Sequence, residues 1–271
     1  MSFVLRHIRD NIWSGRLDIF PEDRLVHGFS ARQGGVSPAP FDALNMALHV
    51  GDDPARVWEN RTRYFAAIGL DAERICTIRQ VHGTEIVCAL RRDAGRGARN
   101  YADALADADA LITNDSGVPL MLCFADCVPV LLYDPVHHAA GVVHAGWKGT
   151  VQRIAAQTVA RMGEEFGTEP SDVIAGIGPS IGAGCYTVGA EVAERFRTAF
   201  PTHADEIIQE QDGALHLDLW AANRLQLVEV GVAADNIDSA DICTSCDRAF
   251  FYSYRAADGR TGRLAAVMEL R

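Results

Sequence analysis

The sequence has 271 residues, of which 48% are hydrophobic and 23% charged, the composition expected of a soluble globular protein with a sizeable core. Its formal net charge of −11 argues against a nucleic acid or an anionic membrane as the main partner, although a local basic pocket can still bind a small anion. No apolar run approaches the roughly 20 residues of a membrane span, and charges interrupt MSFVLRHIRDNIW, so we expect neither a membrane helix nor a signal peptide.

The cysteine content indicates a reducing compartment. An odd number of cysteines with irregular spacing does not resemble a disulfide framework, and a chain of this length does not need one. We therefore expect a cytoplasmic protein in which most thiols pack as small hydrophobic core residues. The seven cysteines are Cys76, Cys88, Cys123, Cys127, Cys185, Cys243 and Cys246.

The first third of the chain predicts edge strands, a long loop and one helix. Residues Met1 to Phe29 should contribute one or two edge strands, and SARQGGVSPAPFDALNMALHVGDDP reads as a long ordered loop, a kind of segment that is often functional. Asp53 as N-cap and Pro54 at the first helical position predict a helix that runs to about Gly69.

Arg61 falls on the apolar stripe of this predicted helix, four residues from both Val57 and Phe65. A guanidinium that faces the core must be paired or must reach into a cavity. The alternative is that its side chain extends along the apolar surface to solvent. The sequence does not separate these two possibilities.

The middle of the chain places polar side chains at the ends of apolar runs. Residues Ile75 to Leu90 predict two strands joined by a hairpin or bulge with His82 at its tip, and the acidic turn in ADADALIT leads into a short strand. Between Leu120 and Thr150, one apolar run breaks at Asp126-Cys127 and the next ends at His144. Strands that deliver a thiol and an imidazole suggest a site built on rigid elements.

The last part of the chain mixes helices and strands. Apolar residues at helical spacing predict a helix from Gly149 to near Gly163, and further helices are expected at about Ala190–Phe200 and from Asp218 to near Gly231. A strand is expected at Asp172–Gly178, before the glycine-rich loop GIGPSIGAGCYTVG, and two strand-like segments close the chain. Consecutive strands without intervening helices favour a mixed-sheet α/β (α+β) fold over a regular doubly wound one.

His82, Cys127 and His144 are the candidate metal ligands. Two histidines and a thiolate suit Zn²⁺ and leave a fourth position for water or substrate, as catalytic zinc requires. A histidine close to Cys127 would equally suit a metal-free Cys-His nucleophile pair. His82 can also be an ordinary surface histidine, and spacings of 45 and 17 residues form no local motif.

Two further motifs carry weaker signals. Cys243-Thr-Ser-Cys246 is a CxxC without a second pair, so we favour a buried structural role over a zinc or redox site. The turn HAGWKGT offers backbone N–H groups and Lys148 to an anion, but it lacks the spacing of a nucleotide-binding P-loop. A simple glycine turn with a surface lysine is the alternative.

Taken together, these motifs resemble the laccase-domain, or multicopper polyphenol oxidoreductase, family, whose members have also been described as zinc-dependent purine nucleoside phosphorylases. The resemblance extends in order from about residue 27 to the C-terminus. It rests on SARQGGVS with LN at 44–45, HVGDDP, NR at 60–61, RQVHG, DADALIT, ADCVPVLLYD, HAGWKGT, GIGPSIGAGCY, CTSC and FYSYR followed by GRTGR.

The resemblance implies a single domain over residues 1–271, with mixed sheets layered between helices. It implies that His82, Cys127 and His144 are both metal ligands and catalytic residues. The implied reactions are phosphorolysis of adenosine, inosine and S-methyl-5'-thioadenosine, together with adenosine deamination. A copper-dependent polyphenol oxidase is an older interpretation of the same family.

Phosphorolysis requires groups that bind phosphate and the purine nucleoside, the partners we expect for a monomer or small homo-oligomer. Our candidates for substrate contacts are Asn45, Arg61, Lys148 and Arg255. Family members commonly continue SYR or SHR with Arg-Asp, whereas Arg255 is followed here by Ala256-Ala257-Asp258, so a second arginine is missing at that point.

Two other enzyme classes remain open at this stage. A laccase needs many histidines in clustered pairs, and of the nine histidines only His137 and His138 are adjacent, which counts against copper oxidation. A Cys-His hydrolase, such as a peptidoglycan-editing enzyme, would use Cys127 as its nucleophile without a metal.

Overall fold

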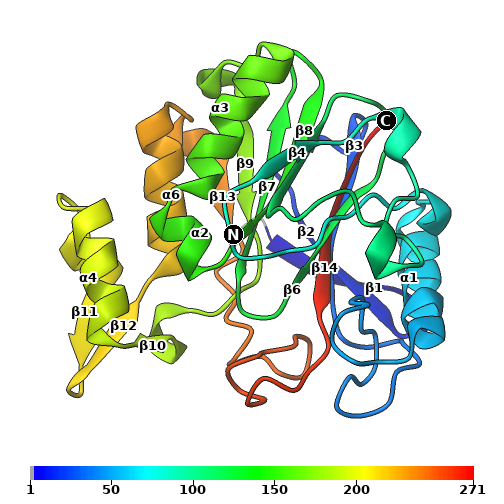
Figure 1. The fold of residues 1–271 in the computed structure, drawn as a ribbon, viewed down its shortest axis with the longest axis horizontal. Coiled ribbons are helices and arrows are strands. Elements are labelled where there is room, and N and C mark those ends of the chain that lie inside the picture. Colours follow the sequence, from blue (N-terminus) through cyan, green and yellow to red (C-terminus); the bar gives the residue numbers. More distant parts are fainter. Residues whose placement is uncertain (1–2) are drawn as a thin grey trace.

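The computed structural model describes residues 3–271, which form a mixed α+β fold of three sheets and six α-helices (Figure 1). A five-stranded antiparallel sheet has the order β1-β2-β3-β14-β6, and a six-stranded mixed sheet has the order β13-β9-β7-β8-β5-β4. The strands of these two sheets are β1 (Phe3–Arg9), β2 (Ile12–Leu17), β3 (Leu25–Ser30), β4 (Ile86–Cys88), β5 (Ala110–Thr113), β6 (Leu120–Phe124), β7 (Val128–Asp134), β8 (Ala139–Ala145), β9 (Ile174–Ile177), β13 (Ile237–Ser239) and β14 (Leu264–Leu270).

A small third sheet and the helices complete the fold. The small sheet has the order β10-β12-β11 and lies with α4 at one side of the molecule, in yellow in Figure 1. Its strands are β10 (Thr187–Val188), β11 (Ile208–Gln211) and β12 (Ala214–Leu217). The helices are α1 (Pro54–Ile68), α2 (Trp147–Val151), α3 (Ile154–Phe166), α4 (Ala190–Ala199), α5 (Ala204–Ile207) and α6 (Leu219–Val230).

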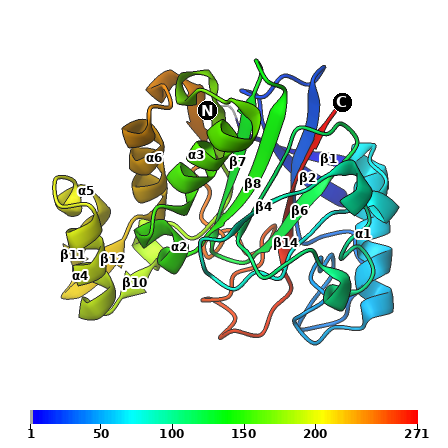
Figure 2. The same ribbon diagram turned by 45° about the horizontal axis from the view of Figure 1, so that its top comes forward.

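The two larger sheets stack face to face between helices. The apolar cluster between the sheets joins Leu122 and Met268 of the first sheet to Leu131 and Val142 of the second. Helix α1 packs on the outer face of the first sheet, and helices α3 and α6 lie on the outer face of the second (Figure 2). The predicted arrangement of mixed sheets layered between helices is confirmed.

Several predicted element boundaries are confirmed. Helix α1 begins after Asp53, whose side chain accepts a hydrogen bond from Ala55 N, and it ends at Gly69 in a left-handed conformation. Helix α6 likewise begins after Asp218 and ends at Gly231. These are the capping residues that the sequence indicated.

The N-terminal prediction was wrong in extent. Residues 3–30 form three strands rather than one or two, and β3 lies inside the sheet, between β2 and β14. A single helix was predicted between Gly149 and Gly163, but the structure has two, α2 and α3. The second of them, α3, continues past Gly163 and ends before Gly167. Arg153 interrupts them because its backbone adopts a left-handed conformation, with φ of 65°.

The predicted hairpin around His82 does not form. Only β4 is a strand, and it pairs in parallel with β5. The run before His82 makes isolated bridges instead, because its backbone bonds go to separate segments, with Thr77 N bound to Arg96 O and Arg79 N to Ala106 O. In the C-terminal part, only β14 of the two expected strands is present; Phe250 lies in a turn and residues 251–253 belong to no strand.

Within residues 3–271, no helix combines the length and the apolar character needed to cross a membrane.

Candidate metal centre and its cavity

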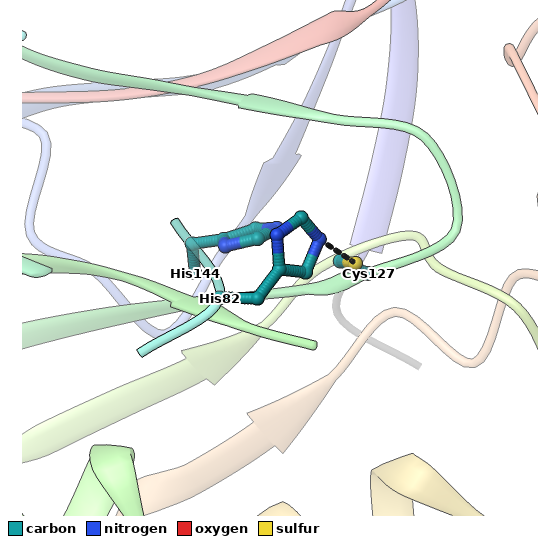
Figure 3. A group of neighbouring side chains, drawn as sticks. All are labelled: His82, Cys127 and His144. Carbon is teal, nitrogen blue, oxygen red and sulfur yellow. Dashed lines mark hydrogen bonds between the residues drawn. The ribbon is translucent and has the colours of Figure 1, made fainter. Parts of the chain in front are cut away.

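His82, Cys127 and His144 converge from three separate segments of the chain (Figure 3). One ligand atom from each side chain lies within 4.8 Å of the others, and His82 Nε2 lies 3.9 Å from Cys127 Sγ. Cys127 sits where the chain passes from β6 in the first sheet to β7 in the second, and His144 lies on β8, opposite Pro129 of β7. The site is therefore built where the two sheets meet.

Asp109 links two of these three segments. Its carboxylate accepts hydrogen bonds from His144 Nδ1 at 2.8 Å, from His82 N at 3.0 Å and from Gly83 N at 2.6 Å. The side chain is buried, and these bonds orient the His144 ring so that Nε2 is the nitrogen free to bind a metal. Sequence reasoning missed Asp109, and the available signal was an acidic residue placed directly before the buried strand β5.

Asp126 fixes the position of Cys127. Its backbone is left-handed, with φ of 80°, and its buried carboxylate accepts hydrogen bonds from Thr244 Oγ1 at 2.7 Å, Ser253 Oγ at 3.0 Å and Arg255 N at 2.7 Å. Three bonds to one carboxylate hold a backbone conformation that would otherwise be unfavourable. The sequence located the break at Asp126 but not this function.

Gln80 and Gly146 bring the ligands close together. The Gln80 amide donates to Cys123 O and accepts from Cys123 N, both at 2.8 Å, which ties the His82 turn to β6. A Cβ atom at Gly146 would lie 3.0 Å from Cys127 Sγ and 3.1 Å from His82 Cδ2. The glycine of HAGW therefore allows the two ligands to approach each other.

The electrostatics of the group favour a thiolate. Burial raises the pKa of Cys127, but the charge of His144 and hydrogen bonds from His144 and His82 outweigh burial and bring the pKa to about 6. Burial lowers the pKa of His144, but the negative charges of Cys127 and Asp109 and their hydrogen bonds raise it to about 9. Cys127 is thus ionised at neutral pH, which both a metal ligand and a nucleophile require.

The donor set fits a zinc ion. In tetrahedral zinc coordination, nitrogen and sulfur donors lie roughly 3.4–3.6 Å apart, close to the His82–Cys127 separation of 3.9 Å. The Asp109–His144 pair is the carboxylate–histidine arrangement that commonly supports such ligands. Three protein donors leave one coordination position open, as in catalytic zinc sites.

These three side chains lie in the wall of a cavity of about 530 Å³, a volume within the range of small-molecule sites. Aromatic rings and two arginines share the lining with them. The lining residues beyond the candidate ligands are His49, Gln80, Cys123, Ala125, Asp126, Trp147, Ile181, Tyr186, Leu219, Tyr254, Arg255 and Arg263.

Of the four candidate substrate contacts, only Arg255 lines this cavity. Its guanidinium lies over the Tyr186 ring, 5.0 Å from the centroid, and donates to Thr187 Oγ1 and Thr187 O at 3.1 Å each. Lys148 is exposed on α2, 5.8 Å from the centroid of the Trp147 ring.

Arg61 and Asn45 are buried away from the cavity lining. Arg61 is 2% exposed, and its guanidinium donates to three backbone carbonyl oxygens, those of Met46, Gly97 and Ala98, at 2.7–2.9 Å. Of the two possibilities that the sequence left open, it is paired inside the protein. The Asn45 side chain binds Asp52 Oδ2, the backbone of Ala47 and Arg263 N. Both residues therefore hold the long loop in place.

Arg263 is the cationic lining residue that sequence reasoning missed. Its Nη1 donates to the carbonyls of Thr261 and Gly262, at 2.7 and 3.1 Å, and its guanidinium lies 5.3 Å from the centroid of the Tyr254 ring. The second arginine of GRTGR was the available signal. Arg263 places a second positive charge at the cavity, beside Arg255, although the arginine that commonly follows Arg255 in the family is missing here.

The preferred role for the CxxC pair, a buried structural one, was wrong for Cys246. That thiol is exposed and Cys243 is half-buried, because both lie in a surface turn.

Comparisons with known proteins agree with this architecture. Residues 26–271 match the family described as multi-copper polyphenol oxidoreductase laccase. The chain is 41% identical over 248 residues to purine nucleoside phosphorylase YlmD of Bacillus subtilis, covering 91% of this chain and 89% of that protein. It is 34% identical over 250 residues to adenosine deaminase RL5 of an unknown prokaryotic organism, covering 92% and 95%. The crystal structure of YlmD from Geobacillus stearothermophilus superposes with a TM-score of 0.94 at 38% identity, covering 100% of this chain and 99% of that one.

Proposed function

Because the chain belongs to the multi-copper polyphenol oxidoreductase laccase family, we propose that it is a zinc-dependent purine nucleoside phosphorylase that also deaminates adenosine. Its substrates would be phosphate with adenosine, inosine or S-methyl-5'-thioadenosine, and its products a free base and a ribose 1-phosphate. The observation that carries the proposal is the convergence of His82, Cys127 and His144 on a cavity that also contains arginines and aromatic rings.

Arg255 and Arg263 are the groups we assign to phosphate. In phosphorolysis a phosphate oxygen forms a bond to the ribose anomeric carbon while the bond to the purine nitrogen breaks, and the electron pair leaves with the base. Guanidinium groups bind phosphate through charge-assisted hydrogen bonds. The bonds of Arg263 described above engage Nη1 alone, so within residues 3–271 its Nε and Nη2 are not committed to a protein acceptor.

The aromatic lining suits the purine. Trp147, Tyr186 and Tyr254 line the cavity, and flat rings of this kind bind a heterocyclic base by stacking. Arg255 over Tyr186 and Arg263 over Tyr254 pair each cation with one ring. A nucleoside whose base contacts the rings would therefore have its ribose and the phosphate near the arginines.

His82, Cys127 and His144 would hold the zinc ion, with Asp109 fixing the His144 ring and Asp126 fixing Cys127. When bound, zinc supplies a Lewis acid that polarises an oxygen atom and lowers the pKa of water to about 7, chemistry suited to nucleoside deamination. The residues of the chain keep the thiolate ionised and the two rings oriented for that ion.

A metal-free Cys-His hydrolase is the second candidate, favoured by the 3.9 Å contact between the Cys127 thiol and His82 Nε2. The carboxylate of Asp109 binds the backbone N of His82, not the His82 ring. The ring that this carboxylate does bind is that of His144. Two rings and one thiol directed at a common point suit a metal better than they suit a nucleophile and one base.

We also propose a cytoplasmic location, supported by seven free thiols among the described residues. A copper-dependent polyphenol oxidase would need several clustered histidine sites. Within residues 3–271, the two groups of potential metal ligands are the His82–Cys127–His144 group and a group of three cysteines.

Incubation of inosine with the protein, with and without phosphate, tests the proposed function. We expect hypoxanthine and ribose 1-phosphate only when phosphate is present. Equal hypoxanthine release without phosphate would identify a hydrolase, and oxidation of a phenol with no nucleoside turnover would favour the oxidase. Adenosine in the same assay should also yield inosine if deamination occurs at this site.

A further inference from the structure

Three cysteines gather outside the cavity described above. Cys185, Cys243 and Cys246 place their sulfur atoms within 4.8 Å of one another, and Cys185 Sγ lies 3.4 Å from Cys246 Sγ. None of the three lines the cavity. Cys185 comes from the loop before β10 and the other two come from the turn after β13, so the group joins segments about 60 residues apart in the chain.

The backbone around Cys243 is arranged to accept a negative charge on sulfur. Gly182 N donates to Cys243 Sγ at 3.3 Å. Burial raises the pKa of the Cys243 thiol, but this bond and others from the backbone N–H groups of Cys246 and Ser245 outweigh burial and lower it. A sulfur atom that accepts a backbone N–H bond from a neighbouring loop, as Cys243 Sγ does from Gly182 N, is suited to hold a metal as a thiolate.

The exposed thiol of Cys246 is difficult to ionise beside the other two sulfur atoms. Contacts with Cys185 and Cys243 raise the pKa of Cys246 to about 12, so one negative charge on the group suppresses the next. A bound cation removes this penalty, because coordination deprotonates a thiol outright. A shared cation would therefore offset the repulsion between negative charges on these neighbouring sulfur atoms.

The two segments are held together independently of the sulfur atoms. Ser180 N donates to Ile242 O at 3.1 Å, and Thr244 N donates to Ser180 O at 3.0 Å. A Cβ atom at Gly182 would lie 3.3 Å from Cys243 Cβ, so the glycine permits the close approach of the loop to the turn. The backbone therefore preorganises the three thiols near one another.

We propose that Cys185, Cys243 and Cys246 form a second metal site, which binds a thiophilic d¹⁰ cation, Zn²⁺ or Cu⁺, through three thiolates. Thiolate ligands select these ions, and three sulfur atoms around either one lie about 3.8–4.0 Å apart, within the spread of this group. Exposure of Cys246 leaves a fourth position open to water for Zn²⁺. Cu⁺ would take the three thiolates alone.

This second site is connected to the wall of the cavity. Thr244, inside the CxxC turn, donates to Asp126 Oδ1, and Tyr186, next to Cys185, lines the cavity. A cation bound by the three thiolates would therefore brace the segments that hold Cys127 and Tyr186. The site does not depend on the proposed nucleoside chemistry.

Metal titration of reduced, metal-free protein under anaerobic conditions tests the proposal, with Zn²⁺ alone in one arm and Cu⁺ alone in the other. A chromophoric chelator of matched affinity competes in each arm and reports the equivalents bound. For at least one of the two ions, we expect two equivalents for the wild type and one for Cys185→Ser and for Cys246→Ser. Cys88→Ser, which removes a half-buried thiol on β4, should still bind two.

The proposal would be overturned if Cys246→Ser still bound two equivalents of metal. It would also be overturned if the wild type bound a single equivalent of each ion. Because Cys246 is exposed, its serine variant should fold even if Cys185→Ser does not. Circular dichroism establishes that each variant is folded. His82→Ala should lose the metal at the His82–Cys127–His144 site and still bind one equivalent at the three cysteines. This variant therefore reports on the cysteine site separately from the first site.

Discussion

Asp109 binds His144 through a hydrogen bond of 2.8 Å between its carboxylate and the ring Nδ1, in the buried space where the two large sheets meet. The same carboxylate binds the backbone N–H groups of His82 and Gly83. One side chain thus positions two of the three candidate ligands, although it would not touch the metal itself.

Replacement of Asp109 with Asn should weaken zinc binding by about 10–100-fold, the usual effect of losing an outer-shell carboxylate. The amide keeps the shape of the side chain but removes the charge and places a donor against N–H groups. Competition with a zinc chelator measures the affinity. Asp107→Asn is the matched control, because Asp107 lies two residues away, is exposed and binds the side chain of Arg79 rather than a candidate ligand. Equal affinities in the two variants would remove Asp109 from the site.

Replacement of Gly146 with Ala should also weaken zinc binding, by roughly 10-fold or more, because the added Cβ pushes Cys127 Sγ and His82 apart. Gly189→Ala is the control, since a Cβ there meets no atom within 4 Å. The same chelator competition reports the result. Wild-type affinity in Gly146→Ala would show that the ligand positions tolerate the extra methyl group.

Arg61→Lys should affect stability rather than substrate binding. A lysine cannot replace three guanidinium hydrogen bonds to buried carbonyls, so the free energy of unfolding should fall by about 2–4 kcal/mol. Urea denaturation measures this change. Arg63→Lys, two residues along α1 at an exposed position, should change it by less than about 0.5 kcal/mol. A large rise in the KM for phosphate with unchanged stability would instead return Arg61 to the substrate site.

The candidate ligands were accessible from the sequence because each is a metal-binding side chain at the end of an apolar run. Their supporting residues were not, because that role depends on what a side chain meets in space. Asp109 looks like part of an acidic turn until β5 and β8 pair and place it beside His144. Asp126 looks like a strand break until Thr244 and Ser253 arrive from the C-terminal part of the chain.

The positions of the candidate substrate contacts were the least predictable part of the site. Arg61 and Arg255 are both arginines in family-like motifs, yet one is sealed among backbone carbonyls and the other lines the cavity. Helical periodicity placed Arg61 on the apolar stripe of the helix, but it did not show whether solvent, a cavity or a set of acceptors meets the guanidinium. The ends of α1, by contrast, depend on its local capping residues Asp53 and Gly69, and they were predicted correctly.

His27 should make the protein less stable in mild acid. Burial and the charge of Arg16 lower the pKa of His27 from 6.5 to about 4, and its Nε2 accepts a hydrogen bond from Leu17 N at 3.0 Å. Because the unfolded chain takes up this proton at a higher pH than the native state, stability falls as the pH drops from about 6.5 to about 4. The full effect is worth roughly 3 kcal/mol.

His27→Gln preserves an acceptor for Leu17 N but cannot be protonated. Urea denaturation at a series of pH values should show a shallower loss of stability for this variant than for the wild type between pH 6.5 and 4. If the wild type and His27→Gln lost stability in parallel between pH 6.5 and 4, His27 would not be held in its neutral form in the native state.

The central claim is that a metal ion held by His82, Cys127 and His144 is required for phosphate-dependent cleavage of purine nucleosides. The most direct measurement is ribose 1-phosphate formation from inosine by chelator-stripped protein, before and after addition of Zn²⁺. We predict negligible product before addition and recovery afterwards in the wild type and in Cys88→Ser, with no recovery in Cys127→Ala. Full activity of the stripped protein, or zinc-restored activity in Cys127→Ala, would contradict the account.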